Sequence, residues 1–205
     1  MSQTAVAPDG KQRCQWCLAT PEYLRYHDTE WGFPVDDEFK LFEKLCLESF
    51  QSGLSWRTIL TKRENFRRAF HHFDYNKVAL FTADDVERLL QDAGIVRHRG
   101  KIEAVINNAQ RAVELVKKEG SLAAYLWRFE PKPENLATPQ TVSTSAESVA
   151  LSKALKKQGW KFVGPTTIYA FMQAMGLVND HAEGCVVRER VEDARKRFQV
   201  SYKKC

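Results

Sequence analysis

Apolar side chains recur at helical spacing along most of the chain. In the segment DDEFKLFEKLCLESF, residues 36–50, Phe39 and Phe42 begin an apolar stripe behind acidic side chains that suit a first helical turn. Residues 100–120 form a long amphipathic stretch that ends at a glycine, and residues 166–178 are apolar enough for a largely buried helix. The pattern predicts a helix in each of these segments.

Two further segments carry the residues typical of helix ends. Thr82 and Asp85 have capping-box spacing at the start of TADDVERLLQDAG, and Thr144 and Glu147 have it in TSAESVALSKALKKQG. Each segment closes on a glycine, which favours a helix stop. We find no set of alternating strand-like runs, no internal repeat and no low-complexity tract, and EPKPENLATPQTVSTS is the one loop-rich stretch. The prediction is an all-α fold.

Composition indicates an ordinary globular protein of the reducing cytoplasm. The 205 residues suffice for one sizeable core or two small lobes, with 43% hydrophobic and 28% charged residues. No apolar run reaches the length of a membrane span, and MSQTAVAPDGKQR lacks the hydrophobic stretch of a signal peptide. Without a secretory signal, the five cysteines favour metal ligation or core packing over disulfides. The net charge of +5 permits a polyanionic partner.

Cysteines and histidines near both chain ends could form a metal site. In NDHAEGC, His181 and Cys185 have the spacing that stacks two ligands on one helix face. Cys14 and Cys17 form a C-x-x-C, and His27 follows in YLRYHDTEWG. Any two of these three could complete a tetrahedral zinc shell that joins the two ends of the chain. The alternative is that the thiols are core residues and His181 is a capping or surface histidine.

Glu48 occupies an unusual position for a carboxylate. It falls on the apolar stripe of its predicted helix, so it must be paired, protonated or bound to a ligand. Gly53 then breaks the helix, which leaves Leu54 at a turn before Trp56. The ordinary alternative is a helix-capping carboxylate next to core residues. Aromatic residues crowd the N-terminal segment and could line a slot for a flat base or simply pack: Trp16, Tyr23, Tyr26 and Trp31.

The stretch KKQGWKFVGPTT, residues 156–167, joins two predicted helices through a short turn. Its glycines allow the positive φ of a tight hairpin, and Pro165 suits the first turn of the next helix. Amides at that helix start could hold a phosphate, assisted by nearby lysines, although a simple interhelical turn would look similar. GIVRHRGK, residues 94–101, is a second basic turn that could touch a nucleic-acid backbone. The DNA contacts expected at the hairpin are Gly159, Lys161, Gly164 and Thr166.

Together these stretches resemble the bacterial 3-methyladenine DNA glycosylase I family, of the helix-hairpin-helix DNA glycosylase superfamily. The resemblance runs in fixed order through RCQW, YHDTEWG, LCLES, GLSW, KREN, DAGIVRHRGKI, LSKALKKQGWKFVG and GLVNDHAEGC, from residue 13 to residue 185. It implies one structural zinc ion on Cys14, His27, His181 and Cys185, a base-contacting Glu48, a base pocket of Trp16, Tyr23, Tyr26 and Trp56, and Leu54 entering the duplex. Cys17 is then a spare thiol. One departure is Ser49, where family members usually have glycine.

The resemblance also implies a compact fold with two lobes around the base pocket. We expect a flexible extension over residues 1–13, a single glycosylase domain over 14–185 and a charged tail over 186–205, which we expect to be a solvated helix. The helix-hairpin-helix unit should cover about 145–177.

The implied activity is hydrolytic excision of 3-methyladenine from alkylated double-stranded DNA, leaving an abasic site. The enzyme should be a monofunctional N-glycosyl hydrolase, without lyase activity, acting as a monomer away from membranes. An aspartate downstream of the hairpin serves relatives in the wider superfamily, but the position of Asp180 beside His181 favours a structural role.

Two other classes compete with this interpretation. A non-catalytic DNA-binding module with a structural zinc would not need Glu48. A zinc hydrolase would need an open coordination position, which four protein ligands would not leave.

Overall fold

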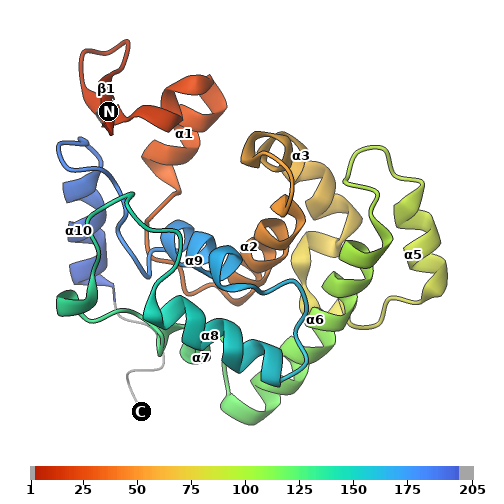
Figure 1. Ribbon diagram of the computed structural model, residues 1–205. Helices are drawn as coiled ribbons and strands as arrows, with labels where there is room; N and C mark the ends of the chain where they lie inside the picture. Colours follow the sequence, from red (N-terminus) through yellow and green to blue (C-terminus); the bar gives the residue numbers. More distant parts are fainter. Residues whose placement is uncertain (1–2, 199–205) are drawn as a thin grey trace.

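The computed structural model describes residues 3–198, and most of the regular structure is helical (Figure 1). The helices are α1 (Pro21–Thr29), α2 (Glu38–Gln51), α3 (Trp56–Ala69), α4 (Tyr75–Val78), α5 (Ala83–Leu90), α6 (Arg99–Glu119), α7 (Leu122–Trp127), α8 (Ala146–Lys157), α9 (Pro165–Ala174) and α10 (Arg188–Arg197). Three short 3-10 helices are η1 (Gln15–Ala19), η2 (His71–Phe73) and η3 (Pro133–Asn135), and the strands are β1 (Thr4–Val6) and β2 (Gln12–Cys14). Within the described residues, no helix is long and apolar enough to cross a membrane.

Helix α2 lies at the centre of the molecule and packs against α3, α6, α7 and α9. Every residue from 41 to 50 is buried, with Phe42 and Phe50 fully enclosed. The helix begins at Asp37, whose carboxylate accepts hydrogen bonds from the amides of Phe39 at 3.0 Å and Lys40 at 2.9 Å. Because α2 has no solvent-facing side over this stretch, polar side chains on it must find partners within the protein.

The five helices predicted from the apolar pattern are confirmed as α2, α5, α6, α8 and α9. The amide of Thr82 donates to the Asp85 carboxylate at 2.9 Å, as the capping-box spacing predicts. Gly120 ends α6 in the left-handed region, with φ of 87°. The pattern did not single out α1, α3 or α7, although α1 begins with Thr20 as a cap and proline at its first position.

The predicted cap of α8 is shifted by one residue. Ser145, not Thr144, is the cap: the amides of Ser145 and Ser148 bond to each other's hydroxyl oxygens at 2.8 and 3.1 Å. Glu147 is not the reciprocal partner, because its carboxylate accepts a hydrogen bond from Asn135 instead. With Ser145 as the cap, the third helical position is Ser148, so Glu147 is out of register for the box.

The expectation of an all-α fold with a flexible N-terminal extension is corrected by a small hairpin. Strands β1 and β2 pair antiparallel, with Thr4 opposite Cys14. The turn closes through a hydrogen bond from the Ala7 amide to the Lys11 carbonyl at 2.9 Å. Gly10 in this turn has a positive φ of 79°. The sequence PDG was the available signal for this turn. Strands of three residues are too short to show alternation, which is why the pattern missed them.

The described part of the charged C-terminal segment is a helix that packs on the domain. Val191 of α10 is fully buried, and Arg195 pairs with Glu130 at 2.9 Å. The expected solvated helix is therefore solvated on its outer face only. Residues 199–205 of the predicted tail lie outside the described residues.

Glu38, in the first turn of α2, caps the N-terminus of α7. Its carboxylate accepts hydrogen bonds from the amides of Leu122 and Ala123 at 2.9 and 3.0 Å and from the Tyr75 hydroxyl at 3.1 Å. Two otherwise orphaned helix donors are therefore satisfied across the core.

Glu38→Ala should lower the free energy of unfolding by about 1.5–3 kcal/mol, because it strands donors bonded to a charged acceptor. Urea denaturation measures the effect. The control is Glu114→Ala, which removes a surface pair with Arg111 and should change stability by less than about 0.5 kcal/mol. Equal losses in the two variants would contradict the capping role.

Candidate active site and metal centre

A small cavity of about 170 Å³ opens where the N-terminal segment meets α2, α3 and α9. Its lining combines aromatic rings with a buried carboxylate and two amides: Trp16, Tyr26, Trp31, Glu48, Gln51, Trp56, Ala170 and Gln173. Segments far apart in the sequence therefore build one pocket. Such a cavity suits a flat, partly polar ligand.

Glu48 is buried in this pocket, with 6% of its surface exposed, and it is paired. Lys44, one helical turn earlier on α2, places its Nζ 2.9 Å from Glu48 Oε1. The same ammonium donates to the Tyr26 hydroxyl at 2.7 Å and lies 3.4 Å from the centroid of the Trp56 ring. Of the possibilities left open for a carboxylate on an apolar stripe, pairing is the one observed. The sequence analysis missed Lys44, although its i, i+4 spacing from Glu48 was visible.

Burial dominates the electrostatics of this group. It lowers the pKa of the Lys44 ammonium, and attraction to Glu48 partly offsets the change. Burial also raises the pKa of the Tyr26 hydroxyl well above its usual value, and the Glu48 charge adds to that rise. Tyr26 is therefore neutral and can accept the hydrogen bond from Lys44.

The predicted aromatic residues occupy two layers. Trp16, Tyr26 and Trp56 line the cavity. Trp31, for which the sequence left open whether it packs or lines a base site, lines the cavity too. Tyr23 is not among the lining residues and packs edge-on behind Trp16, with ring centroids 5.8 Å apart. The Tyr26 and Trp56 rings lie next to each other on the cavity wall, with centroids 5.7 Å apart and planes tilted by 43°.

Leu54 lies on an exposed turn at the end of α2. Gly53 has a positive φ of 79°, and 41% of the Leu54 surface is exposed. Lys101, from the predicted basic turn, is buried and donates to the carbonyls of Phe50 at 2.9 Å and Ser52 at 2.6 Å. This lysine therefore caps α2 and holds the turn that presents Leu54, so it is not free for a nucleic-acid backbone.

The turn between α8 and α9 is anchored to α6. Asn108 bonds both the amide and the carbonyl of Lys161, at 2.8 and 2.9 Å, while the Lys161 side chain is exposed. Gly159 has the expected positive φ of 85°, but Gly164 has φ of −64°, and the second left-handed residue is Phe162 at 55°. The expectation that both glycines supply positive φ is therefore half wrong.

Two polar residues complete the surroundings of this turn. Thr166 is exposed in the first turn of α9. Ser49, the expected departure from the family pattern, is within hydrogen-bond reach of the Phe162 carbonyl at 2.9 Å. Its hydroxyl therefore links the pocket helix α2 to the turn.

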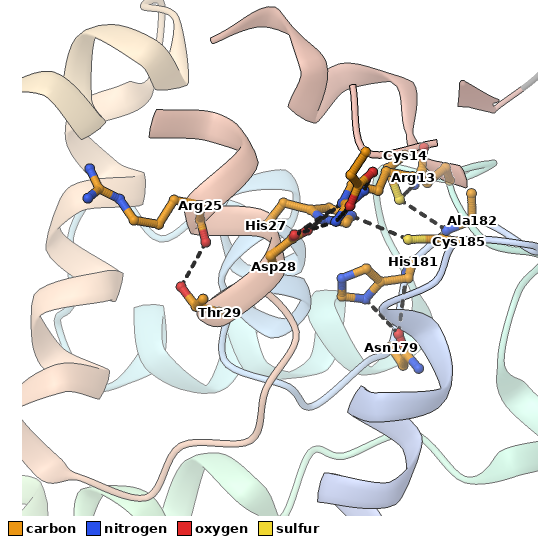
Figure 2. Close-up of polar contacts among 12 residues, drawn as sticks. Arg13, Cys14, Arg25, His27, Asp28, Thr29, Asn179, His181, Ala182 and Cys185 are labelled. Atoms are coloured by element: carbon orange, nitrogen blue, oxygen red, sulfur yellow. Dashed lines mark hydrogen bonds and ion pairs between the residues drawn. The ribbon is translucent and has the colours of Figure 1, made fainter. Parts of the chain in front are cut away.

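A second cluster joins the two ends of the described chain (Figure 2). Cys14, His27 and Cys185 are buried, and their ligand atoms lie within 4.8 Å of one another, so they could hold a metal ion. Nδ1 of His27 lies 2.8 Å from the Asp28 carboxylate, which Arg13 binds in turn. This contact leaves Nε2 of His27 facing Cys185 at 3.5 Å.

His181 lies beside this cluster, with its ring centroid 4.8 Å from that of His27. Its Nδ1 is 2.9 Å from Asn179 Oδ1, and its buried Nε2 has no hydrogen-bond partner. His181 is not among the three residues whose ligand atoms lie within 4.8 Å of one another, although its unpartnered buried nitrogen lies beside them. Two thiols and an imidazole are donors that zinc prefers, so these three side chains fit a metal ion.

Electrostatics favour the ligand form at Cys185 and His181 but not at Cys14, because the hydrogen bond to Cys185 and burial raise the pKa of the Cys14 thiol. The Cys14 hydrogen bond and the nearby His27 lower the pKa of the Cys185 thiol, while burial lowers the pKa of His181 to about 4. Burial also lowers the pKa of His27, but hydrogen bonds to Cys17, Cys185 and Asp28 outweigh it and bring the value to about 10. A thiolate and neutral His181 are ligand forms, and the negative charge that stabilises protonated His27 would stabilise a metal cation.

Asp180 has a structural environment. It is buried outside the pocket lining and accepts hydrogen bonds from the Gln140 amide at 2.9 Å and from Gln173 at 2.6 Å. Gln140 also donates to the Cys14 sulfur at 3.1 Å. Asp180 thus links a pocket wall to the metal cluster.

Comparison with known proteins places this arrangement in a family. The methyladenine glycosylase family pattern matches residues 16–189. DNA-3-methyladenine glycosylase 1 of Escherichia coli (strain K12) is 52% identical over 178 residues, or 85% of this chain and 95% of that protein. A crystal structure of 3-methyladenine DNA glycosylase I has a TM-score of 0.81 and 49% identity, covering 85% of this chain and 98% of that one.

A second solved structure adds a ligand. A variant 3-methyladenine DNA glycosylase I in complex with 3-methyladenine has a TM-score of 0.81 and 39% identity, covering 86% of this chain and 97% of that one. The pocket, its buried carboxylate and the match over most of the sequence lead to one conclusion: this chain belongs to the methyladenine glycosylase family.

Proposed function

We propose that this protein is a DNA-repair glycosylase that excises 3-methyladenine from alkylated double-stranded DNA. The observation that carries the proposal is the buried Glu48 in a small aromatic pocket beside the exposed Leu54. Family membership supports the reaction type. A buried carboxylate in a cleft is a candidate for contact with a ligand.

The proposed reaction needs little acid catalysis from the protein. Methylation at N3 makes the adenine cationic and a good leaving group, so the enzyme must find, flip and hold the base while water attacks the sugar. The Tyr26 and Trp56 rings suit a cationic purine through stacking, and Glu48 can accept its hydrogen bonds. Leu54 enters the duplex where the base has left. The N-terminal segment and α9, together with α2 and α3, would surround the base.

The proposed reaction is monofunctional hydrolysis that leaves an abasic site. A lyase needs a lysine that can reach the sugar. Lys44 is one helical turn deeper along α2 than Glu48, away from the Leu54 turn, and its ammonium is held by Glu48 and Tyr26. We therefore assign it no nucleophilic role.

The proposed domain spans 14–185, with α8, the turn and α9 as its helix-hairpin-helix unit. The turn would bind DNA phosphate through Lys161, the Gly159 to Gly164 backbone and Thr166. The exposed Lys161 and the anchored backbone of the turn support this assignment.

We further propose that one structural zinc ion binds Cys14, His27, His181 and Cys185. The orphaned Nε2 of His181 and the thiolate character of Cys185 support this ligand set. When bound, zinc would supply a crosslink between the chain ends. With four protein ligands it would have no open position for water, which argues against a zinc hydrolase.

Glu48→Gln should lower release of 3-methyladenine from methylated duplex DNA roughly ten- to a hundred-fold, the value of a charge-assisted hydrogen bond of about 1.5–3 kcal/mol. Binding to undamaged DNA should barely change, because no flipped base reaches the pocket. Thermal melting verifies folding, since Lys44 loses its partner. The matched control is the exposed Glu22→Gln.

If Glu48→Gln excises 3-methyladenine at the parental rate, Glu48 is a core carboxylate without a role in base recognition. Failure of the parent protein to release free base would sink the proposed function itself. Strand cleavage by the parent without added base would instead reveal lyase activity.

Cys185→Ala should lose bound zinc and lower the melting temperature, because the metal crosslinks the chain ends. Metal analysis and thermal melting measure the two effects. Cys17→Ala is the control, since Cys17 is also buried against His27 but is not a proposed ligand. Full zinc content in Cys185→Ala, or an unchanged melting curve with lost turnover, would contradict a structural zinc.

Lys161→Ala should flatten the plot of log affinity for DNA against log salt by about one unit, the loss expected for one phosphate contact. Binding titrations at several salt concentrations measure the slope. Lys117→Ala, at the exposed C-terminal end of α6, should leave it unchanged. An unchanged slope for Lys161→Ala would indicate an ordinary interhelical turn.

A further inference from the structure

The loop between η3 and α8 is fastened to the metal cluster through Gln140. The backbone of Gln140 is left-handed, with φ of 57°, a conformation that residues with a side chain seldom adopt and that costs conformational energy. Two contacts hold the loop there. The Gln140 amide donates to Asp180 Oδ1 at 2.9 Å, and the carbonyl of Pro139 accepts from the Gln3 side chain at 2.9 Å. A strained residue persists only where its surroundings enforce it.

From this backbone the Gln140 side chain reaches Cys14. Its Nε2 lies 3.1 Å from the Cys14 sulfur and 3.2 Å from the Asp180 carbonyl oxygen. A side-chain amide has two N–H donors, and these two acceptors use both. The contact with Asp180 also fixes the orientation of the amide, because a carbonyl oxygen only accepts and would repel Oε1 of Gln140. The nitrogen, not the oxygen, therefore faces the sulfur.

The Cys14 sulfur receives a second N–H donor from the far end of the domain. The backbone amide of Ala182 lies 3.3 Å from this sulfur (Figure 2). Cys14 is fully buried, so solvent does not supply these hydrogen bonds. A cysteine binds a metal as a negatively charged thiolate, and a buried charge is unfavourable unless hydrogen bonds offset it. Two N–H groups directed at one buried sulfur meet this need.

We propose that Gln140 is a positioning residue of the metal centre, whose side-chain amide donates to the Cys14 sulfur and stabilises it as a ligand. The proposal rests on the zinc site of the proposed function. Gln140 does not itself bind the ion. Its hydrogen bond offsets part of the charge of the sulfur and holds the sulfur in place, as the outer partners of metal ligands commonly do.

Gln140→Leu removes the donor and should weaken zinc binding about ten- to a hundred-fold, the usual effect of losing an outer partner of a metal ligand. Competition of the zinc-loaded proteins with a chelator of known affinity measures this. The control is Gln158→Leu, which removes a glutamine donor from the Tyr125 hydroxyl at 2.7 Å, outside the metal cluster. It should leave the zinc affinity unchanged.

A spectroscopic measurement separates this role from simple anchoring of the loop. Co²⁺ bound to cysteine sulfur absorbs in the near ultraviolet through sulfur-to-metal charge transfer. An N–H donor stabilises the sulfur electrons, so loss of the Gln140 hydrogen bond should move this band of the Co²⁺-loaded protein to longer wavelength. Gln158→Leu should leave the band in place. Weaker metal binding with an unmoved band would mean that Gln140 only anchors the loop, and would overturn the proposal.

Gln140→Gly covers the case in which Gln140→Leu does not fold. Glycine adopts φ of 57° without strain and keeps the backbone amide that bonds Asp180. It should also weaken zinc binding and move the Co²⁺ band. If the parent protein binds zinc and a folded variant of Gln140 binds it equally well, only the role of Gln140 fails. If the parent binds no zinc, the proposed metal site fails with it.

Discussion

Helix α2 imposes the main constraint on this molecule, because it is buried on every side and still carries polar side chains. Those between residues 41 and 50 are Glu43, Lys44, Glu48 and Ser49. Each would cost free energy without a partner. Glu48 pairs with Lys44 within α2. The other partners come from other elements: Arg67 of α3, Tyr26 of α1 and the Phe162 carbonyl in the turn before α9. The pocket forms where these hydrogen bonds and ion pairs come together, so its geometry follows from them.

The closure of the chain ends serves the pocket through helix α1. Tyr26 and His27 are neighbours on α1, and consecutive helix positions point about 100° apart. Tyr26 therefore faces the 170 Å³ cavity while His27 faces Cys14 and Cys185. The backbone bond from Val186 to Gln12 at 2.9 Å closes the same junction. The contacts of His27 with Cys14 and Cys185 therefore fix the rotation of α1. The position of Tyr26 in the cavity wall is fixed with it.

The surroundings of Glu48 show how a buried carboxylate can be stabilised by the protein itself. A lone Glu48 beside aromatic rings would be an uncompensated buried charge, which is strongly destabilising. Lys44 provides the countercharge from the same helix, and the Trp56 face accepts it. The features that suit the pocket to a cationic base are therefore the ones that hold the ammonium.

Local pattern determined much of this protein. Apolar periodicity located α2, α5, α6, α8 and α9, because a helix face is written at fixed spacing along the chain. The same periodicity exposed Glu48 as a carboxylate on an apolar face, and ordered motifs singled out Cys14, His27 and Cys185, which the structure brings together. These inferences need only neighbours in sequence or resemblance to a family.

Tertiary structure decided how those residues are partnered. In the folded protein Glu48 pairs with Lys44, Tyr23 packs behind Trp16 instead of lining the cavity, and Lys101 caps α2. Ser145, not Thr144, caps α8. The spacing of the Glu48–Lys44 and Ser145–Ser148 pairs is visible in the sequence, but the other outcomes are not, because hydrogen-bond partners and pocket walls depend on which helices pack together. A buried polar group accepts whichever partner that packing brings within reach.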